Sequence, residues 1–292
     1  MKISVVMAVL NDEQNVATTI EAILAQTEPD FEFIIVNDGS TDRTPAILAD
    51  FANRDARIRV ITQANAGLTR ALIRGCAEAR APFIAREDSG DISLPERLAA
   101  QLRAFEADDV MLVSCTARFV APDGEELYLV ERDGNAVRES FLHDDADHIV
   151  GMPGHPTAMF RRDAYLRAGG YREQFWFAQD LDLWVRLAAL GRIVIVPEIL
   201  HEAVFAVQSV SGRYRDEQVE LANIALQLRN ASDEQRAALL ARAAKIRPRP
   251  RAMTGRERAK ANYFLAAVLR RRNDLRWLKY AWRAVWAWVG GG

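Results

Sequence analysis

The sequence has few of the residues from which redox or metal-thiolate chemistry is built. Its 292 residues include two cysteines, Cys76 and Cys115, each within an apolar pattern. Such cysteines indicate core packing in a reducing compartment rather than a disulfide framework or a metal site. The four histidines show no metal-ligand spacing either. Neither zinc chemistry nor a disulfide-stapled fold is therefore expected.

Long hydrophobic runs are also missing. No stretch reaches the roughly 18 apolar residues that a membrane-spanning helix needs. The apolar N-terminus is followed at once by polar residues, without the cleavage site of a signal peptide, so we interpret Ile3–Val9 as a buried strand. The Gly-x-Ser-x-Gly, phosphate-binding Gly-Lys and dinucleotide Gly-x-Gly-x-x-Gly motifs are absent, which disfavours most hydrolases, kinases and dehydrogenases.

Charge is nearly balanced overall but unevenly distributed. The formal net charge is −2, yet the segment from Arg242 to the end carries 14 Lys or Arg against two acids. Residues 1–241 are correspondingly acidic. A basic tail on an acidic body predicts an anionic partner for the tail, either a membrane surface or nucleic acid.

Apolar runs alternate with helical patterns through the first 107 residues. The predicted strands are Ile3–Val9, Phe31–Val36, Ile58–Thr62 and the run before Asp88, and the predicted helices are Asn11–Gln26, Pro45–Ala52 and Leu68–Ala79. This alternation predicts an α/β fold with a mostly parallel, doubly wound sheet. Ligands bind such sheets outside the carboxyl ends of the strands. Four polar residues fall at those ends: Asn11, Asp38, Asn65 and Asp88.

The pattern changes after residue 107. We predict strands at Val110–Cys115, Ala158–Phe160 and Ile193–Val196, a hairpin around the turn at 122–124, and a helix within Phe175–Leu190. Beyond Ser211 the pattern predicts helices, in the segments Asp216–Arg229, Ser232–Ala244 and Gly255–Val289. We therefore expect one domain over 1–212, with halves 1–107 and 108–212, and a helical region over 213–292.

The stretch Phe83–Arg97 carries an apolar strand into an acidic turn and then a helix start. One or two carboxylates together with substrate phosphates form the usual Mg²⁺ or Mn²⁺ site. Asp88 and Asp91 could hold such an ion against the two phosphates of a nucleotide. The alternative is a solvated turn that favours the following helix start.

Asp38 could hydrogen-bond a base edge, with Asn11 and Arg70 lining the same crevice. The alternatives are a turn-forming Asp38 and a solvated Arg70.

A second acidic point lies at Gln179–Trp184. Asp180 falls where a helix begins, so it is either a general base for an incoming hydroxyl or an acid that complements the helix dipole. The i, i+2 spacing places Asp182 on a different helix face, so the two do not form a paired-carboxylate unit. His155 could contact an acceptor or a phosphate, or simply pack.

Together these segments resemble the family-2 glycosyltransferases with the GT-A fold, a bacterial group that builds surface polysaccharides. The matching stretches are Ser4–Asn15, Ile34–Thr44, Asn65–Gly67, Phe83–Gln101, His155–Arg162 and Gly169–Leu187, in that order. The resemblance covers roughly residues 1–212. It implies a GT-A catalytic domain, with a donor half at 1–107 and an acceptor half at 108–212, and a C-terminal helical extension outside it.

The resemblance implies inverting transfer from a nucleotide-sugar, by default a UDP-sugar, to a hydroxyl of a saccharide or lipid-linked acceptor in polysaccharide or lipopolysaccharide biosynthesis. Asp180 would be the catalytic base, and Asp91 and Asp88 would hold Mg²⁺ or Mn²⁺. The implied donor-binding residues are Ala8, Asn11, Asp38, Asn65, Arg70, Arg86 and Asp88. The implied acceptor-binding residues are His155, Asp182 and Trp184.

Several positions depart from the family pattern. Gly90 stands where the central metal-binding Asp is usual, Gln179 replaces a Glu, and Ala8 replaces a frequent Pro. Val204 and Ala206 stand where an Arg and a His are frequent. These departures leave open a different function, a catalytically weakened nucleotide-sugar-binding homologue that acts as an assembly subunit. A nucleotidyltransferase is disfavoured because the first strand lacks a Gly-rich basic loop.

The tail lies outside the resemblance. Its last segment repeats apolar residues on one helical face and cations on the opposite stripe: Leu278, Trp282, Val285, Trp286 and Val289 against Arg276, Lys279 and Arg283. This layout suits a helix lying in an anionic membrane surface, which would place a cytoplasmic protein at the inner face of the plasma membrane. The alternatives are docking on the catalytic domain or on a second copy in a homodimer. Nucleic acid is not expected, because no recognised motif accompanies the charge.

Overall fold

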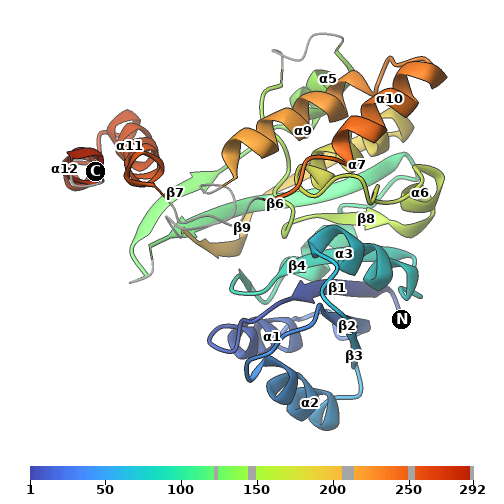
Figure 1. Ribbon diagram of the computed structural model, residues 1–292. Helices are drawn as coiled ribbons and strands as arrows, with labels where there is room; N and C mark the ends of the chain where they lie inside the picture. Colours follow the sequence, from blue (N-terminus) through green and yellow to red (C-terminus); the bar gives the residue numbers. More distant parts are fainter. Residues whose placement is uncertain (122–123, 144–148, 206–213, 249–253, 290–292) are drawn as a thin grey trace.

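The computed structural model describes residues 1–121, 124–143, 149–205, 214–248 and 254–289 (Figure 1). Within them one mixed sheet runs in the order β3-β2-β1-β4-β8-β6-β9-β5, with β7 paired to β6 at the side. The predicted α/β architecture is confirmed.

The first half is the parallel part of the sheet. Its strands are β1 (Ile3–Val9), β2 (Phe31–Asn37), β3 (Ile58–Thr62) and β4 (Phe83–Asp88), joined by helices α1 (Val16–Leu24), α2 (Thr44–Arg54) and α3 (Leu68–Ala77). β1 pairs in parallel with β2 and β4, and β2 pairs in parallel with β3. These strands agree with the predicted ones; β1 and β2 in particular are apolar runs buried on both faces, which leaves few alternatives.

The first helix is shorter than predicted. It begins at Val16 instead of Asn11, because Asn11 takes a left-handed conformation with φ 51° and the chain turns at Asp12. The amide of Asn15 donates to the carbonyl of Asp12 at 3.3 Å. Residues 11–15 therefore form a loop at the carboxyl edge of the sheet.

The second half makes the sheet mixed, with both antiparallel and parallel pairings. β8 (Met159–Arg161) pairs antiparallel with both β4 and β6 (Val110–Val120), while β9 (Arg192–Val204) runs parallel to β6. The predicted hairpin is formed by β6 and β7 (Glu126–Val130), and β5 (Ile92–Ser93) pairs with β9. The helices of this half are α4 (Arg97–Arg103), α5 (Gly134–Leu142), α6 (Arg162–Arg167) and α7 (Gln179–Leu190). The prediction missed α5 and α6 and made the last strand too short.

Two apolar cores lie on opposite faces of the sheet, as the period of two along each strand requires. Val6 and Ile34 face the core built with α3, α5, α6 and α7, whereas their neighbours Val5 and Ile35 face the core built with α1, α2 and α4. Trp184 is the largest fully buried side chain and lies in the first of these cores.

The C-terminal region is helical, as predicted. α9 (Arg215–Gln227) packs on α7, and α10 (Asp233–Ala243) packs on α9. The predicted 255–289 segment is two helices, α11 (Gly255–Arg271) and α12 (Trp277–Val289), because Asn273 is left-handed and breaks it. They form a hairpin that stands at the β6–β7 end of the sheet (Figure 1). No helix among the described residues is long and apolar enough to cross a bilayer.

Candidate active site

The polar residues predicted at the strand ends meet at one edge. In the sheet register Ala8, near the end of β1, lies between Val36 of β2 and Asp88 of β4. Asp38 follows β2 directly, and its amide donates to the carbonyl of Val9 at 2.9 Å. The carboxyl ends of β1, β2 and β4 therefore present one continuous polar rim.

Asp38 organises the first part of this rim. Its buried carboxylate accepts hydrogen bonds from Gln63 Nε2 at 2.7 Å and from the amides of Ala66 and Gly67, both at 2.9 Å. Asn11 fixes the loop that follows β2, since its Oδ1 accepts a hydrogen bond from the amide of Thr41 at 2.7 Å. Both side chains thus hold loops of this rim in place, and Asn65 stands exposed on one of those loops.

Trp176 is a residue of this crevice that the sequence analysis missed. A Cβ on Gly67, which has φ +89°, would lie 2.5 Å from Cη2 of Trp176, so the indole covers the glycine directly. The loop carrying Trp176 is fastened nearby, because Thr69 Oγ1 donates to the carbonyl of Phe175 at 2.6 Å. The available signal was an aromatic residue in the short segment between Gly169–Gly170 and Asp180.

Arg70 reaches the same loop, with Nη2 3.3 Å from Oε2 of Glu173, and both side chains are more than half exposed. This exposed pair also fits the alternative of a solvated helix face, so the donor-binding role of Arg70 stays a prediction.

Arg86 is fully buried beneath the acidic turn, although the resemblance placed it on the donor. Its Nη2 is paired with Asp88, and its Nη1 donates to the carbonyls of Val6, at 3.3 Å, and Glu87. Its Nε donates to Nε2 of His155 at 3.2 Å. Arg86 is therefore placed to orient the Asp88 carboxylate from behind.

His155 is buried against this guanidinium. Because Nε2 accepts from a cation, the imidazole is neutral; burial first, and the Arg86 charge second, hold the pKa of His155 well below its usual range. The hydroxyl of Tyr171 lies 2.8 Å from the same nitrogen. His155 therefore links Arg86 to the acceptor half.

The turn after β4 is built around Gly90. Gly90 has φ +96°, a conformation that favours glycine, and its amide donates to Thr19 Oγ1 at 3.0 Å. The amide of Asp91 donates to the carbonyl of Asp88 at 3.3 Å. The Asp88 side chain is 37% exposed and the Asp91 side chain 16%, so both reach the rim.

The residues of this turn fit a divalent cation. Burial raises the pKa of Asp91 well above its usual value, and the negative charges of Asp88 and Glu87 raise it further. A bound cation would relieve that repulsion. Among the described residues no three His, Cys, Asp or Glu side chains group as a metal site. Two carboxylates completed by substrate phosphates are nonetheless an ordinary Mg²⁺ arrangement.

Asp180 enters the site from α7. It lies in the first turn of the helix, after Ala178 in a left-handed conformation, and its Oδ1 accepts from the amide of Leu181 at 2.9 Å. Burial raises the pKa of Asp180 to about 6, and the nearby Asp88 charge adds to the rise. The fold thus brings the candidate base from α7 near the candidate phosphate turn of β4.

Asp182 and Trp184 point away from this rim. Asp182 is 2% exposed and forms ion pairs with Arg172 Nη1 at 2.7 Å and Arg186 Nη2 at 2.5 Å. Trp184 is fully buried and donates from Nε1 to the carbonyl of Pro153 at 3.2 Å. The structure therefore leaves neither side chain facing a ligand, because both are used to pack α7.

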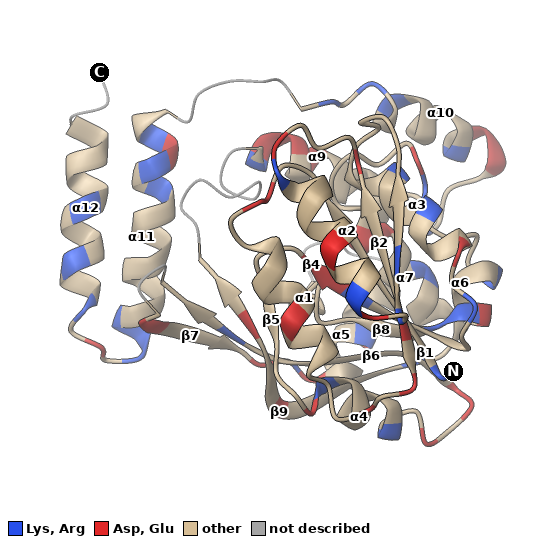
Figure 2. Cartoon of the chain, turned by 90° about the horizontal axis from the view of Figure 1, so that it is seen from below, with Lys and Arg blue, Asp and Glu red and all other residues tan. Residues whose placement is uncertain are grey.

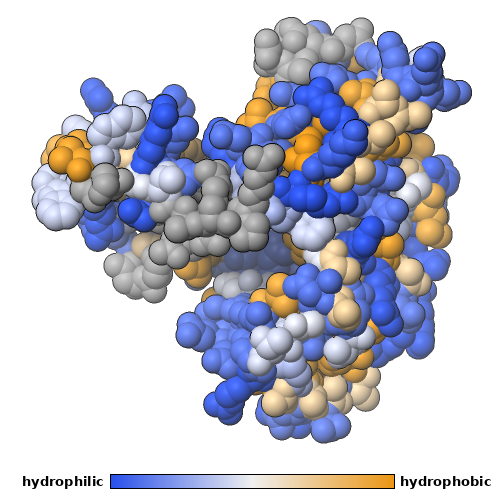
Figure 3. All heavy atoms as spheres, in the orientation of Figure 1, coloured by the Kyte–Doolittle hydropathy of each residue, from blue (hydrophilic) through white to orange (hydrophobic). Residues whose placement is uncertain are grey.

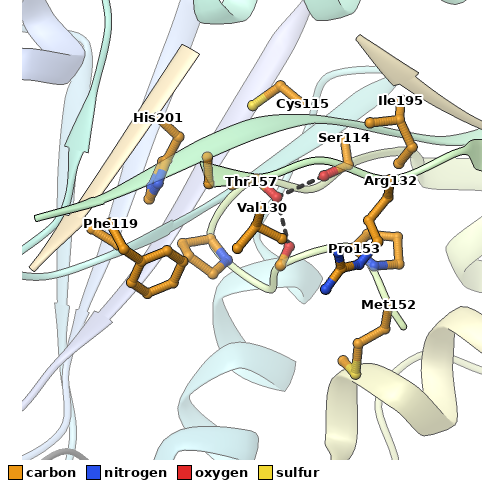
Figure 4. Close-up of a pocket in the computed structure, with 14 residues that line it drawn as sticks. Ser114, Cys115, Phe119, Val130, Arg132, Met152, Pro153, Thr157, Ile195 and His201 are labelled. Carbon is orange, nitrogen blue, oxygen red and sulfur yellow. Dashed lines mark hydrogen bonds between the residues drawn. The ribbon is translucent and has the colours of Figure 1, made fainter. Parts of the chain in front are cut away.

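A cavity of about 140 Å³ opens in the second half, between β6, β9 and the loop before β8 (Figure 4). Its lining is largely apolar, with Phe119, Met152 and Ile195 among its residues. His201 lines it as well, and the buried Nδ1 of His201 has no hydrogen-bond partner among the described residues. The other ring nitrogen lies 3.7 Å from Oδ2 of Asp91, so the cavity adjoins the acidic turn.

Comparison with known proteins identifies the chain. The model of the glycosyl transferase family 2 matches residues 4–168, more than half of its length. The chain belongs to glycosyl transferase family 2. The protein is 32% identical over 189 residues to the O-antigen biosynthesis glycosyltransferase WbnJ of Escherichia coli, covering 63% of this chain and 71% of that one. It is accordingly a glycosyltransferase.

Solved structures share the fold at low identity. S. aureus TarS 1–349 in complex with UDP-GlcNAc superposes with a TM-score of 0.60 and 15% identity, over 93% of this chain and 82% of that one. Pyrobaculum calidifontis mannosyltransferase PcManGT, in complex with GDP-Man and Mn²⁺, gives a TM-score of 0.60 at 16% identity, over 98% and 84%. The chain spans 53% of a longer TarS structure. The predicted GT-A fold is thereby confirmed.

Proposed function

We propose that this family-2 glycosyltransferase moves a sugar, with inversion, from a nucleotide-sugar to a hydroxyl of a saccharide or lipid-linked acceptor in surface-polysaccharide or lipopolysaccharide synthesis. The observation that carries the proposal is the environment of Asp180 at the start of α7, where burial raises its pKa to about 6 and the charge of Asp88 adds to the rise. A carboxylate with that pKa is ionised at neutral pH and remains basic enough to take a proton.

The donor lies along the rim of the first half in this proposal. The Asp38 crevice, with Asn11, Asn65, Arg70 and the Ala8 backbone around it, receives the nucleoside, and the Asp88–Asp91 turn faces its two phosphates. A divalent ion held by Asp88 and Asp91 neutralises charge on the departing diphosphate when bound. UDP is the default nucleotide, and both UDP-GlcNAc and GDP-Man are bound by proteins of the same fold.

The acceptor hydroxyl approaches from the second half. Asp180 removes its proton as the hydroxyl oxygen forms a bond to the anomeric carbon and the bond to the diphosphate oxygen breaks. The cavity beside His201 adjoins the acidic turn, and it suits part of an acceptor sugar. The Nδ1 atom of His201, which has no partner among the described residues, provides one hydrogen bond to a sugar hydroxyl in this cavity.

Asp180→Asn tests the proposal, because it keeps the shape of the side chain and removes the base. Released nucleoside diphosphate is measured with UDP-, GDP- and dTDP-sugars and an acceptor extract, and binding of the free nucleotides is measured by calorimetry. We expect turnover to fall about 10²- to 10⁴-fold with nucleotide affinity preserved. Asp163→Asn, at an exposed carboxylate on α6, is the matched control.

The alternative function, a nucleotide-sugar-binding assembly subunit, predicts a different result. Under this alternative the wild-type protein binds a nucleotide but does not turn over the donor, so Asp180→Asn has no turnover to lower. Such a result would overturn the proposed transfer reaction. Pyrophosphate release from a nucleoside triphosphate would instead point to nucleotidyl transfer.

A further inference from the structure

The α11–α12 hairpin stands apart from the catalytic body. It contacts the body through a small apolar cluster that joins Leu265 and Leu269 of α11 and Tyr280 of α12 to Leu127 of β7. Both views show the two helices side by side at one end of the molecule (Figures 1 and 2). The position exposes most of the hairpin surface to solvent.

Two of the cations that the sequence places on the stripe opposite the apolar face of this segment, Arg276 and Lys279, are engaged with the body. Arg276 pairs with Glu125 at 2.9 Å and donates to the carbonyl of Glu126 at 2.8 Å. Lys279 lies 3.5 Å from the same Glu125 carboxylate. These contacts hold the start of α12 on the β6–β7 hairpin and fix which face of the helix turns outward.

The outward face of α12 is its most apolar one. We call it the tryptophan stripe: Leu278, Trp282, Val285, Trp286, Trp288 and Val289. Each of these side chains is more than half exposed, whereas Tyr280 and Ala284 on the inner face are buried. The alternative in which α12 buries these aromatic residues on the catalytic domain is therefore wrong. An exposed apolar patch of this kind marks a surface that meets a partner.

A row of cations on α11 lies beside the tryptophan stripe. We call it the basic row: Arg256, Lys260, Arg270 and Arg271. Their spacing puts all four on the helix face that also carries exposed Tyr263. No ion pair joins any of the four to a carboxylate in the part of the chain that the structure describes. Their charge is thus available to an external anion.

The basic row and the tryptophan stripe share one side of the hairpin. Arg256 lies over the ring of Trp288, a member of the stripe, at 5.7 Å, and Arg270 lies over the ring of Trp277, which begins α12 outside the stripe, at 5.3 Å. Between the helices runs an open groove of about 380 Å³, lined by Tyr263, Arg270, Arg271 and Trp277 among others. In Figure 3 the protruding hairpin shows pale and orange surface next to the blue of its charged residues.

We propose that the hairpin docks on an anionic phospholipid bilayer, with the tryptophan stripe in the interface and the basic row on lipid phosphates. Tryptophan favours the boundary between headgroups and acyl chains, and a 13-residue helix such as α12 can lie in that plane but cannot cross it. A second copy is a poorer partner, because covering the stripe in a symmetric pair brings two basic rows together. The docking does not depend on the transfer reaction.

Vesicle sedimentation of the full chain tests this docking. The protein is mixed with sucrose-loaded vesicles of phosphatidylcholine alone or with 30 mol% phosphatidylglycerol, a composition chosen for the assay, and the bound fraction is measured against lipid concentration and salt. We expect binding to the anionic vesicles and little to the neutral ones. Arg270→Gln with Arg271→Gln should weaken binding about 25-fold, from about five-fold per cation near an anionic leaflet.

Matched variants separate the two parts of the surface. Arg80→Gln with Arg103→Gln removes the same charge from exposed positions on the catalytic body and should leave binding unchanged. Trp282→Ala with Trp286→Ala should abolish the binding that persists at high salt, while circular dichroism shows a folded protein. Donor turnover on a water-soluble acceptor should be the same in every variant, which keeps this test apart from that of the transfer reaction.

Two results would overturn the docking. The wild type could remain in the supernatant with anionic vesicles, or the hairpin and body variants could bind equally. Sedimentation velocity without lipid supplies a further check: a dimer that dissociates on Trp282→Ala with Trp286→Ala would assign the stripe to a second copy of the chain.

Discussion

Arg97 and Glu87 form an ion pair in which neither side chain is exposed to solvent, with Nη1 2.7 Å from Oε2. Burial alone would raise the pKa of Glu87, but the charge of Arg97 and the contact with His201 hold it below its usual value. Arg97 Nη2 also donates to the carbonyl of Arg86 at 2.5 Å. The pair forms the floor beneath the Asp88–Asp91 turn.

Removing one partner of this pair should be costly. Arg97→Met leaves the Glu87 carboxylate buried without its cation, and we expect a loss of about 3–5 kcal/mol in the free energy of unfolding. Urea denaturation measures it. The matched control is Arg54→Met, whose pair with Asp50 is equally short at 2.7 Å but has both side chains 61% exposed. Arg54→Met should change the free energy of unfolding by no more than about 0.5 kcal/mol. Equal losses in Arg97→Met and Arg54→Met would contradict the stabilising role of the buried Arg97–Glu87 pair.

The raised pKa of Asp180 gives the reaction a defined pH dependence. A base works only when ionised, so kcat/KM should be level above pH 6 and fall about ten-fold per pH unit below it, following the pKa of about 6. His155 does not cause this fall in kcat/KM at low pH, because its own pKa is held well below its usual range. Initial rates between pH 4.5 and 8 at saturating donor measure the profile. Asp180→Glu should move the midpoint, and Asp163→Asn should not; a flat profile would remove Asp180 from the base role.

The parallel half of the fold could be predicted because its signals are local. A strand such as β2 is an apolar run that ends in polar turn residues, here Asn37-Asp38-Gly39, so its type and limits follow from the residues themselves. The length of β9 does not follow in this way. It continues past Pro197 to Val204 because β6 supplies a parallel partner along the whole length, with register shifts that accommodate the irregularity. Such pairing between distant segments leaves no local trace.

The sequence could place the candidate site residues at strand ends and a helix start, but it could not give the orientation of their side chains. The i, i+2 spacing correctly separates Asp180 from Asp182, yet it cannot say which of the two turns inward. Their partners decide that: Asp182 pairs with Arg172 and Arg186 in the interior, whereas no ion pair holds Asp180 among the described residues and the charge of Asp88 helps to raise its pKa. Arg86 likewise looked like a donor contact in the sequence, but its guanidinium folds back under Asp88. The partners of a buried charge come from other elements, which the sequence does not place.

Asp182 should matter for stability more than for acceptor affinity. Asp182→Asn leaves two guanidinium groups without their carboxylate, so we expect the free energy of unfolding to fall by about 3–5 kcal/mol. The acceptor KM of the folded enzyme should change little, because Asp182 is only 2% exposed. Asp163→Asn, 69% exposed and 3.7 Å from Arg167, is the control for loss of an aspartate charge. A large rise in KM at unchanged stability would restore the acceptor-binding role.

The Asp88–Asp91 turn should make nucleotide binding depend on a divalent ion, even though Gly90 stands between the two acids. The pKa of Asp91 is raised by burial and by Asp88 and Glu87, so a cation gains by relieving their repulsion. Calorimetry of UDP, GDP and dTDP, each with Mn²⁺ and with EDTA, measures the effect. We expect one nucleotide to bind more tightly with Mn²⁺, and Asp91→Asn to lose at least the roughly ten-fold that removal of a supporting residue costs a metal site.

The control for this last prediction is Asp30→Asn, at the opposite end of β2 from the rim, which should leave Mn²⁺-dependent binding intact. Equal binding with Mn²⁺ and with EDTA would mean that the turn grips phosphate without a metal. In that case no residue of the turn replaces the metal-binding aspartate that the family usually has at position 90. The positive φ of Gly90 and the hydrogen bond from its amide to Thr19 Oγ1 would then belong to a turn rearranged to work without a metal. Loss of Mn²⁺ dependence in Asp91→Asn alone would instead show that Asp91 has taken over that aspartate's part.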